Sequence, residues 1–384
     1  MKISTELKQS NLRQLNLSIV YYSIYKNKEI SRQQLVKNLN LSLPTVVQNI
    51  TDLLSEGLIE EVGFSKSTGG RPAMVYRINS SAKVSVGVEL LPHKINMAII
   101  DLYGEILFEN TLLIAFENNG HYFSTVGNWI NSNISSFIND QSTVLGVDIA
   151  IPGIIAADNE HIMYSEVLHC TDFTLSDFSS KIDFPCSFMH DAEAGAYAEL
   201  WHGERPRNAF YFILNDYFSN ALILNGEVFK SSNLSSGTLE HLIIHSDGKP
   251  CYCGKKGCID SYISAQSLLA ESHSATLDDF FSHLREGSDA EKRIWDNYLS
   301  DLALSIDSAR MAIACDIVIG GVLQRYMIQK DIDILKQKIR QITTFKAADF
   351  SIKIGSCGRK GVVIGAGIPR IEGFLSQIAD LQLP

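Results

Sequence analysis

The 384-residue sequence contains no apolar run approaching the roughly 18 residues that a membrane-spanning helix requires. Its N-terminus, MKISTELKQSNLRQL, lacks the apolar stretch of a secretory signal peptide. Low-complexity tracts and short-period repeats are absent as well. With 45% hydrophobic and 20% charged residues, the composition excludes disordered and fibrous classes. It predicts a soluble, cytoplasmic protein of two or three domains, without a membrane partner.

Positive charge is scarce overall, and it is unevenly distributed. The net charge is −10, yet residues 1–82 hold ten Lys and Arg against six Asp and Glu, a balance of +4. The rest of the chain holds 23 basic and 37 acidic residues, a balance of −14. A basic head on an acidic body is typical of a DNA-reading module joined to another function. A balance of +4 can also arise by chance.

Cysteine is sparse, and three of the seven cysteines fall within eight residues. An odd, clustered set does not fit a secreted disulfide scaffold. Structural zinc needs four tetrahedral Cys or His ligands, and the spacing predicts that set to be His241, Cys251, Cys253 and Cys258. His245 is a rival for the fourth position. The alternatives are free thiols in a loop and a catalytic zinc with an open position.

The first 60 residues carry the pattern of a helix-turn-helix. A leading helix over about 11–25 is followed by a short helix capped by Ser31 and a second one capped by Ser42. In the second helix we expect a buried stripe of Val46, Val47, Ile50, Leu53 and Leu54. The outward face is expected to carry Thr45, Gln48, Asn49 and Asp52. Gln and Asn can bond adenine edges bidentately. The alternative is a generic three-helix bundle with a solvated polar face.

The segment after these helices predicts a wing. Two strands, LIEEVGFS and PAMVYRIN, flank the tip KSTGGRP. Two glycines let the backbone come close to DNA, and arginine suits a narrow minor groove. The tip residues expected to contact DNA are Lys66, Gly69, Gly70 and Arg71. A flexible hairpin loop is the alternative. Together the two patterns predict a winged helix-turn-helix over 1–82 that binds double-stranded DNA.

From Lys83 onward the pattern changes to strands in meanders followed by helices. This arrangement occurs twice, which predicts an α/β fold with two lobes around a cleft. We expect the first lobe at 83–190 and the second at 191–384, with the last helix returning to the first lobe.

The chain resembles the repressor branch of the ROK family, named for repressors, open reading frames and kinases. The resemblance begins near residue 10 and is carried by ISRQQLVKNLNLSLPTVVQNITDLLSEGLIEEVG, STGGRP, DIAIPGII, GTLEH with CYCGKKGCID, and IVIGGV. It implies a winged helix-turn-helix joined to a two-lobed, actin-like, ribonuclease H-like sugar-kinase domain. It also implies dimers or tetramers that bind operators of carbohydrate-utilisation genes under the control of a sugar effector.

The resemblance further implies effector contacts at His190, Asp191, Thr238, His241 and Asp260. Asp191 and His241 match the family pattern, Asp260 is a shorter acid, and His190 and Thr238 differ from it. A sugar or a sugar derivative is therefore the expected ligand. The alternative is a zinc-stabilised scaffold without a ligand response.

A kinase of this family would carry an Asp-x-Gly-x-Thr phosphate loop in its first hairpin. Here the equivalent stretch is Gly87–His93, GVELLPH, in which leucines replace the glycines and Pro92 removes a backbone N–H. Gly320 and Gly321 still match the second phosphate segment, or simply retain the geometry of the fold. The sequence thus predicts a regulator without enzymatic activity. The alternative is an ATP-dependent ROK sugar kinase with an added DNA-binding head.

Overall fold

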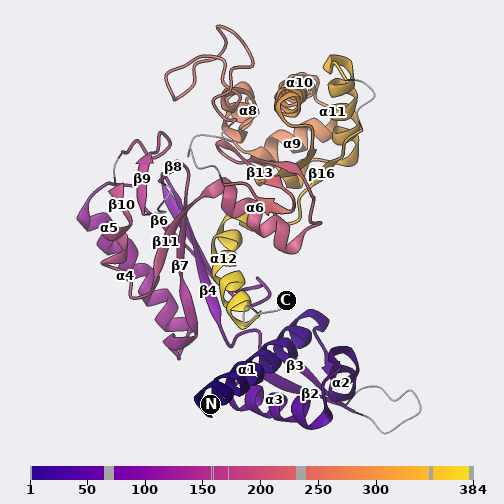
Figure 1. Cartoon of the computed structure of the whole chain (residues 1–384). Helices are drawn as coiled ribbons and strands as arrows, with labels where there is room; N and C mark the ends of the chain where they lie inside the picture. The colour runs from indigo at the N-terminus through magenta and orange to yellow at the C-terminus, as the bar shows by residue number, and fades with distance from the viewer. Residues whose placement is uncertain are drawn as a thin grey trace.

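The structure is a computed structural model that describes residues 2–64, 73–156, 158, 160–171, 173–230, 239–345 and 349–379. It consists of an N-terminal head and two α/β lobes, with the head at the foot of the first lobe (Figure 1). None of the described helices is long and apolar enough to cross a membrane.

The head combines three helices with a small antiparallel sheet. The helices are α1 (Lys2–Asn27), α2 (Arg32–Leu39) and α3 (Leu43–Ser55). The strands β1 (Ile30–Ser31), β2 (Ile59–Phe64) and β3 (Met74–Ile78) pair in the order β1-β3-β2. The predicted caps are confirmed, because Ser31 accepts from the N–H of Gln34 and Ser42 from that of Thr45.

The first lobe is built on a five-stranded sheet of order β11-β7-β4-β5-β6. Its strands are β4 (Val84–Leu91), β5 (Lys94–Ile100), β6 (Ile106–Leu113), β7 (Val144–Ile151) and β11 (Cys186–His190). Helices α4 (Gly120–Phe137) and α5 (Leu175–Ser179) pack beside it (Figure 1). A small sheet lies at one end, formed by β8 (Ile154–Ile155), β9 (His161–Tyr164) and β10 (Phe173–Thr174).

The second lobe repeats this topology with the order β14-β13-β12-β15-β16. Its strands are β12 (Ala209–Leu214), β13 (Phe218–Leu224), β14 (Glu227–Val228), β15 (Asp316–Gly320) and β16 (Ile352–Ile354). In each sheet the first three strands form an antiparallel meander and the last two run parallel to its first strand. The predicted two-lobed α/β fold is thereby confirmed. The helices of the second lobe are α7 (Asp260–Ile263), α8 (Ala265–Glu271), α9 (Leu277–Glu286), α10 (Asp289–Ala312) and α11 (Gln329–Ile342).

Two helices lie between the sheets and hold the molecule together: α6 (Asp191–His202) and α12 (Gly361–Ala379) (Figure 1). Helix α12 packs against α6, against β4 of the first sheet and against α1 of the head. The contact with α6 is unusually close, because a Cβ atom added to Gly365 would lie 1.6 Å from the carbonyl oxygen of Ala194. Only glycine permits this approach.

The head shares a hydrophobic core with the first lobe. Ile24 of α1 and Leu53 of α3 belong to one buried cluster with Leu102, which follows β5, and with Ile368 and Ile371 of α12. The head is therefore docked on the lobe by apolar burial as well as connected to it by the short segment between β3 and β4.

The α6–α12 contact can be tested with two glycine substitutions in the same helix. Gly365→Ala should lower the free energy of unfolding by about 1–3 kcal/mol, because the new methyl group has no room. Gly373→Ala is the control, since its added Cβ meets nothing within 4 Å. It should be neutral or stabilise the protein by up to about 1 kcal/mol. Thermal unfolding measures both, and equal melting temperatures for the two variants would rule out the close helix packing.

Candidate metal centre and ligand cleft

A tight loop between Lys249 and Gly257 shapes the cysteine cluster. The backbone N–H of Cys251 donates to Lys255, and that of Gly257 donates to Lys249. Gly257 has φ +80°, and an added Cβ would lie 1.7 Å from the carbonyl oxygen of His245. Glycine is required there because other residues cannot adopt this conformation in that space. The loop thus folds back on itself and returns Cys258 toward the other thiols.

The four predicted ligands converge on one point. The donor atoms of His241, Cys251, Cys253 and Cys258 all lie within 4.8 Å of one another. The Sγ atoms of Cys253 and Cys258 are 3.7 Å apart, and Sγ of Cys251 lies 3.6 Å from Nδ1 of His241. A tetrahedral ion with bonds of about 2.3 Å to sulfur and 2.0 Å to nitrogen would separate two sulfur ligands by about 3.8 Å and a sulfur from a nitrogen by about 3.5 Å. These side chains could therefore hold a metal ion.

The chemistry of the donor set also fits a cation. Burial raises the pKa of the Cys258 thiol to about 12, and burial likewise raises that of Cys251. Without a cation these thiols keep their protons. A bound metal ion would replace the protons and stabilise the thiolates.

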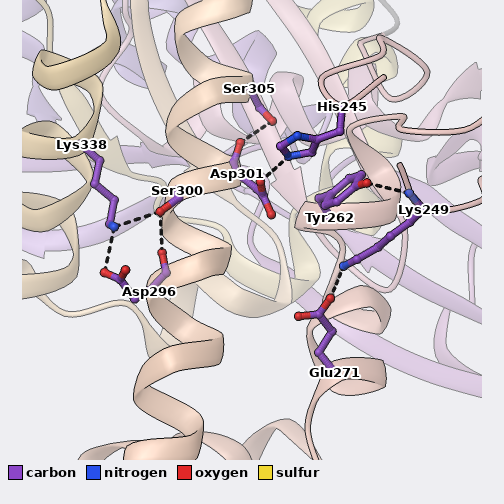
Figure 2. A network of polar contacts seen from close by, with 9 residues as sticks. All are labelled: His245, Lys249, Tyr262, Glu271, Asp296, Ser300, Asp301, Ser305 and Lys338. Carbon is purple, nitrogen blue, oxygen red and sulfur yellow. Dashed lines mark hydrogen bonds and ion pairs between the residues drawn. The ribbon is translucent and has the colours of Figure 1, made fainter. Parts of the chain in front are cut away.

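His245, the rival fourth ligand, has a different partner. Its Nε2 lies 2.7 Å from Oδ1 of Asp301 on α10, and its ring packs against Tyr262 of α7 at 4.6 Å between centroids (Figure 2). In the same network Lys249 forms an ion pair with Glu271 of α8, and its backbone N–H donates to the Tyr262 hydroxyl. His245 therefore fastens the cysteine loop to the helices of the second lobe.

A cavity between the lobes brings together three of the five predicted effector residues: His190, Asp191 and His241. Both lobes contribute to its wall, which is lined by Pro152, Gly153, Ile154, Tyr164, Glu166, Val167, His190, Asp191, Tyr217, Phe218, Ser219, Glu240, His241 and Tyr252. His241 is thus shared by the cavity and the metal cluster. Thr238 lies outside the described residues.

Asp260 does not line this cavity, in contrast to the direct ligand contact expected from the sequence. Its side chain is only 5% exposed, and its Oδ1 accepts from the backbone N–H of Phe218 at 2.6 Å. Burial raises its pKa to about 6. Asp260 therefore holds the first residue of β13 in place through this hydrogen bond and does not face the cavity.

Glu240 lines the cavity, and the sequence interpretation missed it as a site residue. Its Oε2 is buried without a hydrogen-bond partner, and burial raises its pKa to about 7. The signal in the sequence that could have identified it is its position directly before His241, a predicted ligand of the metal. Asp191 stands beside it at the start of α6, with Oδ1 accepting from the N–H of Ala192 at 2.8 Å. Burial raises the pKa of Asp191 as well.

A neighbouring cavity contains the expected phosphate-loop region. Glu89, Lys94 and Arg359 line it, and it shares Asp191 with the first cavity. Glu89 is 6% exposed, accepts from Asn96 at 2.7 Å, and has its pKa raised to about 7 by burial.

The strands beside Glu89 continue regularly to their ends. Leu90 pairs with Ile95 and Leu91 with Lys94. Pro92 and His93 alone therefore form the turn between β4 and β5.

The outward face of α3 differs from the predicted one at two positions. Asn49 is only 3% exposed, and its side chain donates to the carbonyl of Thr45 at 3.0 Å. The prediction that Asn49 faces DNA is therefore wrong. Val47, expected in the core, is 37% exposed. Because a helix turns 100° per residue, Val46 and Asn49 share the inner face while Val47 lies outside.

Gln48 and Thr51 are exposed on α3, and Thr45 is half-buried at its start. The side-chain amide of Gln48 donates to Asp52 at 2.9 Å, and Asp52 forms an ion pair with Arg13 of α1 at 2.8 Å. Thr51 was missed by the sequence interpretation, although its spacing of three from Gln48 indicates the same face. The predicted contacts of the hairpin tip, Lys66, Gly69, Gly70 and Arg71, lie outside the described residues.

Two curated relatives match over much of the chain. The xylose repressor of Caldicellulosiruptor bescii is 27% identical over 264 residues, covering 67% of this chain and 66% of that protein. The N-acetylglucosamine repressor of Escherichia coli O157:H7 is 24% identical over 263 residues, covering 68% and 64%. The chain thus spans slightly less than two-thirds of the length of these relatives.

Solved structures share the fold at lower sequence identity. A ROK family transcriptional regulator, a homolog of the E. coli MLC protein, aligns with a TM-score of 0.72 at 19% identity over 96% of this chain and 99% of that one. A ROK family glucokinase from Streptomyces griseus, in complex with glucose and AMPPNP, aligns with a TM-score of 0.65 at 15% identity over 74% and 98%. The family model described as "ROK family" matches residues 85–374. This chain therefore belongs to the ROK family.

Proposed function

We propose that the protein is a cytoplasmic, sequence-specific DNA-binding regulator, a repressor of carbohydrate-utilisation genes whose operator binding responds to a sugar or sugar derivative in the inter-lobe cleft. The observation that carries this proposal is the head, in which α2, α3 and the β2–β3 hairpin have the order of a winged helix-turn-helix. The likeness to the ROK regulator includes this head, at 96% of the chain, whereas the glucokinase aligns over 74%.

In this proposal α3 is the recognition helix. Gln48 and Thr51 face the major groove, with Thr45 at the N-terminal end of the helix, and Arg71 of the hairpin tip enters the minor groove. Lys66, Gly69 and Gly70 of the tip approach the DNA backbone. The chain acts as a homo-oligomer, a dimer or tetramer, whose two heads meet half-sites about one or two helical turns apart.

Substitutions in α3 should separate DNA reading from folding. We expect Gln48→Ala to relax base preference and to cost about 1–3 kcal/mol of binding free energy at the preferred site, without lowering the melting temperature. Asn49→Ala is the matched control, because the buried amide should affect stability and leave base preference intact. Selection from a random DNA pool followed by titration measures both effects. A Gln48→Ala, Arg71→Ala double variant with the wild-type preference and affinity would contradict the placement of the head.

The alternative of a sugar kinase is less well supported. The β4–β5 turn has only two residues, Pro92 and His93, and presents no run of backbone N–H groups to a phosphate. The acidic residue of this region, Glu89, is buried and hydrogen-bonded to Asn96. These features favour a regulator without catalytic activity.

We also propose that the cysteine cluster holds one structural zinc ion per chain. All four tetrahedral positions are taken by protein side chains, so no position is left open for a water or substrate, as a catalytic zinc would need. The role of the metal is to fix the loop that carries His241 and Glu240 into the cleft wall.

Metal analysis should find close to one zinc per wild-type chain. The Cys253→Ser, Cys258→Ser double variant should contain almost none and should melt at a lower temperature, because structural zinc contributes directly to folding. His245→Gln is the control and should keep its zinc, since His245 is bonded to Asp301. Stoichiometric zinc in the double variant, or its loss in His245→Gln, would refute the ligand assignment.

Helix α6 provides a direct route between the cleft and the head. Asp191, at its first residue, lines the cleft. At its other end Nε1 of Trp201 donates to the carbonyl of Tyr103 at 2.6 Å. The ring of Tyr103 in turn stacks on Tyr25 of α1, with centroids 5.0 Å apart. A ligand that prefers one position of α6 would therefore bias the position of the head.

Two variants should divide ligand binding from ligand response. Asp191→Ala should lose the ligand while retaining zinc and DNA binding, because it removes a carboxylate from the cleft wall. Trp201→Phe should bind the ligand but show at least a severalfold smaller ligand-induced change in operator affinity, because it lacks the hydrogen bond to Tyr103. Trp129→Phe on α4 serves as the control. Operator titrations with and without the sugar identified by thermal-shift screening give the result. An unchanged response in both Asp191→Ala and Trp201→Phe would exclude this route.

A further inference from the structure

We infer that helix α1 pairs with the same helix of a second copy of the chain when two heads bind adjacent half-sites. This inference rests on the proposed function, in which the head binds DNA as part of a homo-oligomer, and it identifies the surface through which two heads meet. The surface is a row of apolar side chains, here called the α1 stripe, that consists of Leu12, Leu15, Ile19 and Tyr22.

The α1 stripe has the spacing of a helix-pairing seam, and it is exposed to solvent. Its members follow one another at intervals of three, four and three residues, the repeat that aligns apolar side chains along one seam of a helix. Leu12 is 58% exposed and Tyr22 is 41% exposed, and the two stripe residues between them are half-buried. Among the residues that the structure describes, no member of the stripe belongs to a hydrophobic cluster of the chain.

A different face of α1 serves the fold. Val20, Tyr21 and Ile24 are buried in the core that the head shares with the first lobe. Because a helix turns about 100° per residue, the centre of this buried face lies roughly opposite the centre of the α1 stripe. The stripe is therefore a second apolar face of the same helix, which the described core of the single chain does not include.

The charges near the stripe favour an apolar helix over DNA as its partner. From Leu12 to Tyr25 the one charged residue is Arg13, and it forms an ion pair with Asp52 of α3 at 2.8 Å. Contacts with DNA phosphates depend on lysine and arginine, and the stripe has neither. A second copy presents the same uncharged apolar row, so the two surfaces are complementary in the way that an isologous contact requires.

The place of α1 in the head indicates why the partner is a second copy. Helix α3, the proposed recognition helix, packs on α1 at the side where Arg13 meets Asp52. Packed helices lie about 8–10 Å apart. Two heads joined through their stripes would therefore hold their recognition helices roughly 25–30 Å apart, close to the length of about 34 Å of one turn of DNA. Both helices could then enter successive major grooves.

The stripe is too short to hold two chains together by itself. Leu12 and Tyr22 are separated by ten positions, which correspond to about 15 Å along the helix. A stable interface buries about 1,200 Å² or more. We therefore expect the pairing to appear as cooperativity between two heads that DNA already holds close together.

The stripe is also connected to the proposed route from the cleft. The ring of Tyr22 stacks on that of Tyr25 with centroids 6.3 Å apart, and Tyr25 stacks on Tyr103. Tyr103 accepts the hydrogen bond from Trp201 of α6. A shift of α6 that reached Tyr25 would thus change how the stripes of two heads meet.

The experiment measures how the arrangement of half-sites affects DNA binding by the full-length, zinc-containing protein. The half-site is the sequence obtained by selection from a random DNA pool. It is presented once, or twice with the centres one turn or two turns of DNA apart. We expect the wild type to bind the one-turn DNA at least about tenfold more tightly than the other two, because only this spacing lets the stripes meet.

Substitutions in the stripe should remove this preference. The double variant Leu12→Glu, Ile19→Glu places charges where pairing would bury them. It should bind one-turn DNA at least about tenfold more weakly, with its affinity for a single half-site within about twofold of the wild type. Leu12→Glu alone, at the most exposed position of the stripe, should change in the same direction if the double variant does not fold. Gln14→Glu is the matched control, since Gln14 is exposed on α1 outside the stripe, and it should behave like the wild type.

The outcomes distinguish this inference from the proposed function. Wild-type affinity of the stripe variants for one-turn DNA, or a wild type without preference for that spacing, would overturn the inference and leave a DNA-binding regulator in place. An equal loss of affinity for the single half-site would also overturn it, because the stripe would then serve folding or DNA contact. If the wild type selected no sequence from the pool, DNA binding by the head and the inference would fall together.

Discussion

The turn between β5 and β6 is the point on which the arrangement of the head, the first lobe and α6 depends. Asp101 fixes this turn by accepting from the backbone N–H groups of Tyr103 and Glu105 at 2.9 and 3.0 Å. The carbonyl oxygen of Tyr103 accepts a hydrogen bond from Nε1 of Trp201 on α6. The ring of Tyr103 stacks on the ring of Tyr25 on α1. Because the same five-residue turn contacts both helices, we expect a shift of one helix to be transmitted to the other.

The packing around α6 determines what kind of response is possible. The helix is pressed against α12 at Gly365, with no space for a methyl group, and α12 is itself pressed against the first sheet and α1. Close-packed interfaces of this kind do not deform continuously, so a change in the cleft is expected to move whole elements between discrete positions. The cleft end of α6 carries Asp191, and the far end carries Trp201. In the proposed regulator, this packing would connect the cleft to the head without a flexible linker.

The features that sequence could predict are those decided by local spacing. The metal cluster is one of them, since three of its ligands fall within one short loop whose glycines fold it back. At Asn49, the polarity of the residue wrongly suggested an exposed position. Its spacing of three from Val46 places it on the inner face of α3, where its side-chain amide donates to the backbone carbonyl of Thr45. The roles of Glu240 and Asp260 could not be predicted from the sequence. They depend on whether each carboxylate faces the cavity, as Glu240 does, or bonds to the backbone outside it, as Asp260 does. That is decided by the packing of β13 against the loop, which connects residues distant in sequence.

The two sheets share one topology, but the segments that resemble phosphate-binding elements of the family are built differently in each. Gly320 and Gly321 at the end of β15 resemble a phosphate-binding segment, but packing alone requires them. A Cβ on Gly320 would lie 2.2 Å from the Tyr211 hydroxyl, and Gly321 has φ +87° with its Cβ position 2.7 Å from the N atom of Leu214. The phosphate-loop region of the first sheet lies instead at the β4–β5 turn, where Pro92 and His93 close a two-residue hairpin. The glycines of the second sheet are thus explained by packing, and their presence does not by itself argue for kinase chemistry.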